Sequence, residues 1–447
     1  MRISLDDARA LALRAAKMTP ADEAEAVVIT TASALTRFAH NRIHQNVAES
    51  DTQLAIRAVL GRKTGVATTN RLDDDGLMRA AAAAVEAARH APEDPDFGGL
   101  PDPAPVTYME RASETTRAFD AARRAEAARD IIAPSKARGL SAAGTVAMSD
   151  SAVAVANSRG VDVAMDVTDV RATVLSMGET AGAGWASFLG KDAGSLTAAA
   201  LGEQAADTAE RSADPVALDP GEYTVVLAPE AVAGILDFLG YLGFGAKAYA
   251  EGSSFLAGAV GQKLFHERIN IYENALLPET VGLTFDFEGQ PKHRTALVER
   301  GVARTPVTDS YFARKLGVPN TGNALPAPNE YGPLAINQEM ASGDGRLEHM
   351  IASIERGVYV SRFHYVNVEE PMKAVLTGMT RDGTFLIEGG RLTNPVRNLR
   401  FTQSAIEALS HVQVVSAERQ LFASDVAGAT LAPALLLERW NFTGQTG

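Results

Sequence analysis

The chain has 447 residues, of which 46% are hydrophobic and 22% charged, as in a folded globular protein that is too long for one ordinary core. Its net charge of −13 argues against a general nucleic-acid-binding protein, because phosphate contacts need a concentrated basic surface. The absence of cysteine excludes disulfides and thiolate chemistry and fits a reducing cytoplasm. No apolar run approaches the roughly 20 residues that span a bilayer, and residues 1–7 lack a signal-peptide core. We therefore expect a cytoplasmic protein with no membrane or direct nucleic-acid contact.

The first half of the chain alternates between helical and strand patterns. Helical spacing of apolar residues predicts helices at 5–17, 73–90, 115–130 and 195–211. Short runs of β-favouring residues predict strands at 26–30, 36–47, 53–60 and through 140–178. Residues 61–65 and 157–160 carry the glycine and asparagine expected of turns between strands.

A punctuated segment divides the chain near its middle. Asp214-Pro215 and Asp219-Pro220-Gly221 are typical of a linker, so we predict one domain over 1–214 and a second over 221–447. Beyond the linker the chain is rich in Gly, Asn and Pro and has short strand patterns. The predicted fold class is α+β, with an antiparallel sheet and helices first and a mostly β domain second.

Residues 229–234 carry the pattern of an altered metal site. They follow the strand-like run 223–228 and open an apolar helical stretch. A zinc peptidase would place His-Glu-x-x-x-His on such a helix, with two imidazoles on the metal and a carboxylate that activates water. Here Glu230 is present, but Pro229 and Gly234 stand where the imidazoles would be. We expect no metal to bind at this helix.

Several blocks spread over nearly the whole chain resemble, in order, the TldD/PmbA family of zinc peptidases. One of them is the block 376–390, which opens with Leu376-Thr377-Gly378-Met379-Thr380, and it is the combination of blocks that is specific. The other blocks are 35–46, 65–72, 156–160 and 398–402. The family is also called modulator of DNA gyrase, a name that refers to processing of gyrase-directed peptides and does not imply DNA binding here.

The resemblance also indicates a branch of the family. The TldD branch carries His-Glu-x-x-x-His and a later cysteine, whereas the PmbA branch, also called TldE, lacks them and pairs with a TldD-type subunit. Pro229, Gly234 and the absent cysteine match the second branch, as do the blocks 360–365 and 380–384. The resemblance thus implies a non-catalytic partner of a TldD-like catalytic subunit, with peptide substrates, a dimeric assembly and the zinc cofactor held by the partner.

Several other residues have two possible interpretations, one as part of a functional site and one as an ordinary structural residue. Glu230 could remain a general base, but without metal-bound water an acidic residue that stabilises a helix N-terminus is the simpler reading. His266-Glu267 begins a metallopeptidase motif that fails, because positions 270 and 271 are Asn and Ile. The glycines of 240–245 do not form a dinucleotide site and favour flexibility or close helix packing.

Six residues of the second half are candidates for contact with a peptide or a partner. The segment 319–324 reads as an exposed loop whose backbone could meet an extended chain, although Asn and Gly favour turns anyway. The other candidates could line a peptide groove or form structural ion pairs, and the pattern does not separate these readings. The six are Asn320, Asn323, Arg362, His364, Arg381 and Asp382.

The function that we predict is a non-catalytic subunit that completes a TldD-type metallopeptidase and admits only unfolded or short peptides. One alternative is a homodimer that binds peptides without cutting them. A second alternative is a peptidase with an unrecognised zinc site among His266, His293, His349 and His364. His411 is a further histidine that could converge in space with the last three.

Overall fold

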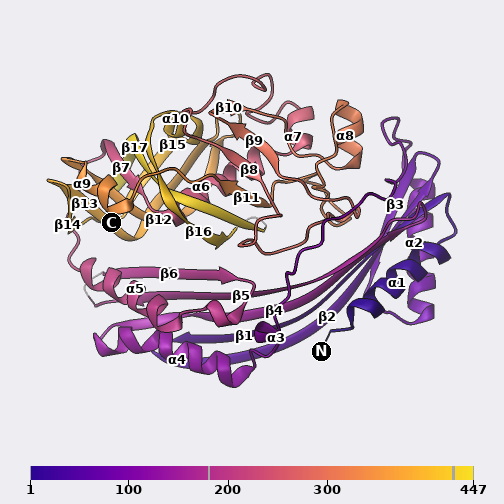
Figure 1. Ribbon diagram of the computed structural model, residues 1–447, viewed down its shortest axis with the longest axis horizontal. Helices are drawn as coiled ribbons and strands as arrows, with labels where there is room; N and C mark the ends of the chain where they lie inside the picture. The colour runs from indigo at the N-terminus through magenta and orange to yellow at the C-terminus, as the bar shows by residue number, and fades with distance from the viewer. Residues whose placement is uncertain (1, 180–181, 425–427, 446–447) are drawn as a thin grey trace.

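The computed structural model describes residues 2–179, 182–424 and 428–445, and these form two β-sheets with helices (Figure 1). The first sheet belongs to the N-terminal half of the chain, and the second is built from residues 221–445. Helices accompany the first sheet, whereas strands predominate in the second. The predicted α+β class is confirmed.

The first sheet is antiparallel throughout and has the strand order β3-β2-β1-β4-β5-β6. Its central strands are long, so that the sheet runs the length of the molecule and curves under the second half (Figure 1). Their bounds are β1 Glu23–Ala39, β2 Arg42–Leu60, β3 Lys63–Thr69, β4 Ser141–Asn157, β5 Asp162–Met177 and β6 Ala183–Gly190.

Helices cover the outer face of this sheet at both of its ends. At one end, α1 (Leu5–Met18) and α2 (Asp74–His90) pack their alanine-rich faces on β1, β2 and β4. At the other end lie α4 (Ala121–Ala137) and α5 (Ala198–Arg211). The short α3 (Glu114–Arg117) contacts the turn η1 (Ala193–Ser195) and lies nearer the middle of the sheet (Figure 1). Ser4, Asp73 and Asp120 cap their helices by accepting a backbone N–H bond.

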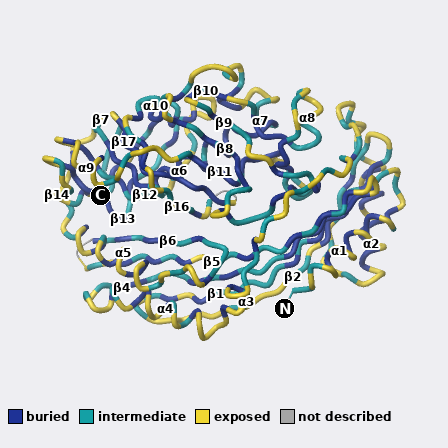
Figure 2. The backbone as a smooth tube through the Cα atoms, in the orientation of Figure 1, coloured by how far each residue is buried: buried dark blue, intermediate teal, exposed yellow. Residues whose placement is uncertain are grey.

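Strand β1 is buried on both faces, which explains its apolar character. Val28 packs under α1 and α2, whereas the adjacent Val27 points to the opposite face and joins a cluster with Phe285 of the second half. Alternate strand residues face opposite sides of a sheet, so the inner face is covered by the second half of the chain. Figure 2 shows the resulting buried layer along these strands.

The second sheet has the order β10-β9-β8-β11-β17-β15-β13-β12-β7, and β7 also pairs with β17. This double pairing closes β7, β17, β15, β13 and β12 into a ring, while β14 and β16 add to its strands. The bounds are β7 Gly221–Leu227, β8 Ile271–Glu273, β9 Thr295–Glu299, β10 Val302–Ala303, β11 Asn337–Met340, β12 Arg356–Glu370, β13 Val375–Glu388, β14 Arg391–Pro395, β15 Leu399–Ser404, β16 Val412–Ala423 and β17 Ala429–Gln445.

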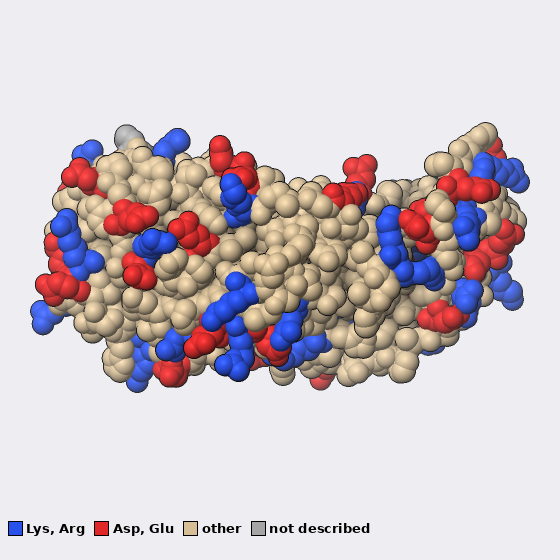
Figure 3. All heavy atoms as spheres, turned by 90° about the horizontal axis from the view of Figure 1, so that it is seen from above, with Lys and Arg blue, Asp and Glu red and all other residues tan. Residues whose placement is uncertain are grey.

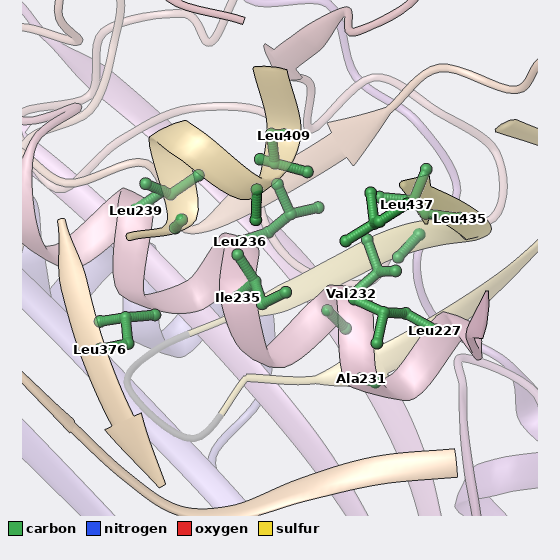
Figure 4. Close-up of a cluster of buried hydrophobic side chains, with 14 of the residues drawn as sticks. Leu227, Ala231, Val232, Ile235, Leu236, Leu239, Leu376, Leu409, Leu435 and Leu437 are labelled. Carbon is green, nitrogen blue, oxygen red and sulfur yellow. The ribbon is translucent and has the colours of Figure 1, made fainter. Parts of the chain in front are cut away.

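Helix α6 (Pro229–Leu242) lies in the core of this second sheet. Val232, Ile235, Leu236 and Leu239 are almost fully buried against strand residues such as Leu435 (Figure 4). Its first turn follows β7 directly, so the buried packing of the helix fixes the place of residues 229–234. The remaining helices are short: α7 Ala246–Ala250, α8 Ser310–Leu316, α9 Leu347–Ala352, α10 Ala405–Ser410 and the turn η2 Pro371–Lys373.

Three predicted boundaries differ from the structure. The strand predicted at 36–47 is interrupted by a turn, because His40 and Asn41 both adopt positive φ and join β1 to β2. The helix predicted at 115–130 is two helices, since the chain restarts at the Asp120 cap, and its second part runs on to Ala137. The helix predicted at 195–211 begins at Ala198, after the turn η1.

Of the two alternatives for the glycines at 240–245, flexibility or close helix packing, the structure shows close packing. A Cβ on Gly243 would lie 2.0 Å from the ring of Phe255, and one on Gly240 would lie 2.5 Å from Gln338 Nε2. Among the described residues, no helix is both long and apolar enough to cross a membrane. Figure 3 shows acidic and basic side chains interspersed on the face seen from above.

Candidate functional site

The first turns of α6 hold the altered metal-site pattern. Pro229 is the first helical residue, and its ring has no atom that could bind a metal. Gly234 has no side chain, and a Cβ built there would meet nothing within 4 Å. The residues at these two positions therefore do not fit a zinc ion, and no metal step can be derived at this helix.

Glu230 is engaged in a contact between the two halves of the chain. Trp185, on β6 of the first sheet, donates its indole N–H to Glu230 Oε1 over 2.7 Å. Both residues are half-buried, so this bond to a charged acceptor is only partly screened by water. The carboxylate that would activate water in a peptidase thus binds a neighbouring indole instead.

Arg362 of β12 extends this contact. Its guanidinium lies over the ring of Trp185, 4.2 Å from the ring centre, which is the geometry of a cation–π interaction. The same guanidinium binds Asp382 of β13 through Nε at 2.9 Å and through an Nη atom at 2.6 Å. We call Trp185, Glu230, Arg362 and Asp382 the interdomain cluster, since it joins β6 to α6, β12 and β13.

Asp382 is held in an unusual backbone conformation. Its φ is +55°, and Gly383 follows with φ +126° at an irregular point of the β12–β13 ladder. Ser361 Oγ donates to the carbonyl oxygens of Arg381 and Asp382, which satisfies backbone groups that the irregularity removes from the ladder. The Asp382 side chain is 3% exposed, so its carboxylate is a buried partner of Arg362.

The structure separates the six predicted contact residues into distinct places. Arg362 and Asp382 form a buried ion pair, and Arg381 Nε lies 3.7 Å from Asp382 as well. His364, also on β12, stacks edge-on against the exposed Tyr365 at 4.8 Å between ring centres. Of the two alternatives for these residues, a peptide groove or structural ion pairs, the structure shows ion pairs at Arg362, Arg381 and Asp382.

The predicted exposed loop at 319–324 is largely buried. Residues 321–324 are buried, and Asn323 is 1% exposed, with its amide donating to the carbonyl of Leu334. Asn320 is half-buried, donates to Ser310 Oγ and accepts from the Gly322 N–H. The expectation of exposure was wrong because asparagine and glycine here close a turn inside the fold.

The candidate histidines occupy separate elements. His266 follows the 252–265 loop, His349 is exposed on α9, and His411 lies after α10 with contacts to Ser410 and Arg439. His293 is exposed just before β9. In the ranges that the structure describes, no group of three or more His, Cys, Asp or Glu side chains is placed to hold a metal ion.

Sequence patterns missed two residues that hold the halves together. Trp185 lies in an ordinary alternating strand, and only its size and single donor distinguish it. Arg111, 1% exposed, donates to the carbonyl oxygens of four residues of the second half, namely Ala275, Leu277, Pro278 and Thr280. Burial lowers the pKa of the Arg111 guanidinium, and nearby Glu279 opposes that shift.

The fold and its domains match known proteins over nearly the whole chain. Residues 220–444 match the sequence model described as the PmbA/TldA metallopeptidase C-terminal domain. Residues 24–88 match domain 1, and residues 96–213 match the central domain, of the same metallopeptidases.

Relatives and solved structures agree with these matches. A metalloprotease TldD homolog of Buchnera aphidicola is 26% identical over 173 residues, or 37% of this chain and 34% of that protein. The metalloprotease PmbA of Escherichia coli O157:H7 is 23% identical over 236 residues, which cover 52% of this chain and 49% of that one. The matched part thus spans between a third and a half of these relatives. The crystal structure of TldE from Thermococcus kodakarensis superposes with a TM-score of 0.88 at 20% identity, covering 97% of this chain and 99% of that one.

Proposed function

This chain belongs to the TldD/PmbA metallopeptidase family, and we propose that it is a non-catalytic subunit that completes a TldD-type peptidase acting on short or unfolded peptides. In this proposal the partner supplies zinc and the catalytic glutamate. This chain supplies a rigid surface that binds the partner and limits access to the catalytic chamber. Access then selects peptides over folded proteins.

The observation that carries the proposal is the set of residues in the first turns of α6, where a zinc peptidase would bind its metal. Pro229 and Gly234 offer no ligand atoms, and the carboxylate of Glu230 accepts the indole N–H of Trp185. A water-activating carboxylate needs a bound water within reach, whereas this one is occupied by a donor from another sheet. The likeness in fold to TldE supports the same reading at the level of the fold.

The experiment is co-purification with a TldD-type subunit that carries His-Glu-x-x-x-His. The tagged chain and the untagged partner are expressed together and separately, and each sample is assayed for zinc and for cleavage of an unfolded peptide. We expect a stable complex with zinc in proportion to the partner and with peptidase activity. The chain alone should hold less than about a tenth of an equivalent of zinc and should not cleave.

Two outcomes would overturn the proposal. The first is one equivalent of zinc on the isolated chain, lost on chelation together with peptide cleavage. The second is failure of the chain to associate with any TldD-type subunit while it forms a stable homodimer that binds peptides. A matched control is the same co-purification with the partner's two motif histidines replaced, which should keep the complex and abolish cleavage.

A further inference from the structure

A cavity of about 560 Å³ lies between the first sheet and the second half of the chain, near α8. One wall is formed by Glu25 of β1, Arg57 of β2 and residues 64 and 66 of β3. The opposite wall comes from α7, the start of α8 and the loop 324–332. Its volume is within the range of small-ligand sites in proteins.

Carboxylates outnumber cations in the lining of this cavity. Five acidic side chains face three basic ones: Glu25, Glu251, Glu288, Asp309 and Glu330 against Arg57, Lys247 and Lys315. Lys247 donates to the backbone carbonyl of Glu330 and lies 3.9 Å from Glu251, and Lys315 binds Asp96, which does not line the cavity. The lining therefore carries a surplus of negative charge.

The buried acids of the lining, Glu25 and Glu288, lie together with Arg57. Arg57 binds Glu25 at 2.8 Å and Glu288 at 3.1 Å, so one guanidinium serves two buried carboxylates. Asp309 lines the cavity together with them, and its Oδ1 accepts the Phe312 N–H. Burial, reinforced by Glu288, raises the pKa of Asp309 to about 6, while the Phe312 N–H and Arg57 oppose the shift.

Aromatic side chains complete the walls. Phe287, Tyr311 and Phe312 line the same cavity, and the rings of Tyr311 and Phe312 meet edge-on at 5.0 Å. Aromatic faces next to carboxylates attract organic cations through both charge and cation–π interaction. The carboxylates already accept N–H donors, and no described group of acids or histidines here is placed to hold a metal ion.

We propose that this cavity binds the ammonium group of a peptide, either its free amino terminus or a lysine side chain, with Asp309 and Glu288 as acceptors and the aromatic wall around the aliphatic part. The excess of carboxylates would repel an anion, and a neutral group would leave carboxylates without a countercharge. The inference rests on the proposed role in peptide processing, since it identifies which end or side chain of the peptide this subunit holds.

The test measures binding of three synthetic probes to the full chain by isothermal titration calorimetry near neutral pH. The probes are an alanine-rich peptide with a free amino terminus, the same peptide acetylated, and the acetylated peptide with one internal lysine. We expect acetylation to weaken binding about tenfold, as for the loss of one charge-assisted hydrogen bond. Restored binding by the lysine probe would show that any ammonium is accepted, whereas no restoration would assign the site to the amino terminus.

Variants connect this binding to the cavity. Asp309→Asn keeps an acceptor for the Phe312 N–H and removes the charge, so it should fold and bind the free-amine peptide about tenfold more weakly. Glu251→Gln, at a rim position 58% exposed, should fold without difficulty and weaken binding about twofold. Asp207→Asn on α5, an exposed acid outside the cavity, should bind as the unmodified chain does.

Equal affinity for the free and acetylated peptides would overturn the inference, as would unchanged binding by a folded Asp309→Asn chain. If Asp309→Asn does not fold, the acetylation comparison and Glu251→Gln decide. Co-purification tests the proposed subunit role independently of peptide binding, because the Asp309→Asn chain should still co-purify with a TldD-type partner. Loss of peptide binding with the complex intact would thus concern the cavity alone.

Discussion

The indole N–H of Trp185 points at Glu230 Oε1 across 2.7 Å and joins the last strand of the first sheet to the first turn of α6. Arg362 covers the other side of the indole and is itself held by Asp382. Glu230, the one residue of the His-Glu-x-x-x-His pattern that this chain keeps, thus fixes two sheets against each other. The Glu230 carboxylate needs a hydrogen-bond donor from the first half of the chain to make this contact, and the indole N–H of Trp185 is that donor.

Breaking this contact should destabilise the chain. Trp185→Phe removes the donor and keeps a ring under Arg362, and Glu230→Ala removes the acceptor. Each change should lower the free energy of unfolding by about 1–2 kcal/mol, because the bond is to a charged acceptor at a half-buried site. Urea unfolding of both variants measures the effect.

The double variant tests whether the two residues act together. If the bond carries the effect, the loss in Trp185→Phe/Glu230→Ala should be smaller than the sum of the single losses by about 1 kcal/mol. Additive losses would show that the 2.7 Å contact contributes nothing of its own. Zinc content should stay unchanged in all three variants, since none of them adds a ligand atom.

The vacant space at Gly234 gives a prediction of opposite sign. Gly234→Ala places a methyl group where nothing lies within 4 Å and removes a glycine from a helix interior. It should raise the free energy of unfolding by about 0.5–1 kcal/mol. The matched control on the same helix is Gly240→Ala, whose Cβ would lie 2.5 Å from Gln338 Nε2 and 3.2 Å from the Ala335 carbonyl oxygen, so it should stabilise the chain less than Gly234→Ala does or destabilise it. Equal effects of the two changes would contradict the packing described for α6.

The sequence was sufficient for the α+β class and for helices such as α2, because apolar spacing and the Asp73 cap are local signals. It also showed that the side chains of Pro229 and Gly234 offer no ligand atom for a metal, since that statement needs only the residue types. The turn at His40 and Asn41 was missed, because two non-glycine residues with positive φ carry little local signature.

The contacts between the two halves could not be predicted. Trp185 and Glu230 are 45 positions apart, and Arg57 and Glu288 are 231 apart, so only the docking of the sheets brings them together. Burial of residues 321–324 depends on the same docking, whereas their composition is that of an exposed turn. Long-range pairing of this kind is set by tertiary packing, which periodicity and turn signals do not encode.

Arg111 should be among the most sensitive positions for stability. Its guanidinium is buried and serves the carbonyl oxygens of Ala275, Leu277, Pro278 and Thr280. Arg111→Met keeps much of the volume and leaves these oxygens without their donor, so unfolding should become easier by about 3 kcal/mol or more. Arg111→Lys should recover only part of the loss, because an ammonium cannot reach four carbonyls in the planar arrangement of a guanidinium. A melting temperature unchanged in both variants would mean that water replaces the lost donors.

Asp286 should make the stability of the chain depend on pH in a defined direction. Its carboxylate is 1% exposed, and burial together with nearby Glu288 raises its pKa to about 7 despite bonds from the backbone N–H groups of Ala324 and Gln290. A carboxyl group with a raised pKa binds its proton more tightly in the folded state. Its stabilisation is therefore complete below the unfolded pKa of about 4 and is lost as the pH rises through about 7.

Urea unfolding between about pH 5 and pH 8 should accordingly show stability falling as the pH rises, by at most about 3 kcal/mol from this group, because the loss ends once the pH passes the folded pKa of about 7. Asp286→Asn cannot titrate, and its amide cannot accept from both sides, so the variant should be about 1–2 kcal/mol less stable at the acidic end. The gap should narrow or reverse at the alkaline end, because only the unmodified chain must bury a charge there. Asp207→Asn, an exposed acid on α5, should keep the slope of the unmodified chain. A slope in Asp286→Asn equal to that of the unmodified chain would show that the proton is bound elsewhere, with Glu25 and Asp309 as the next positions to replace, since burial raises the pKa of both.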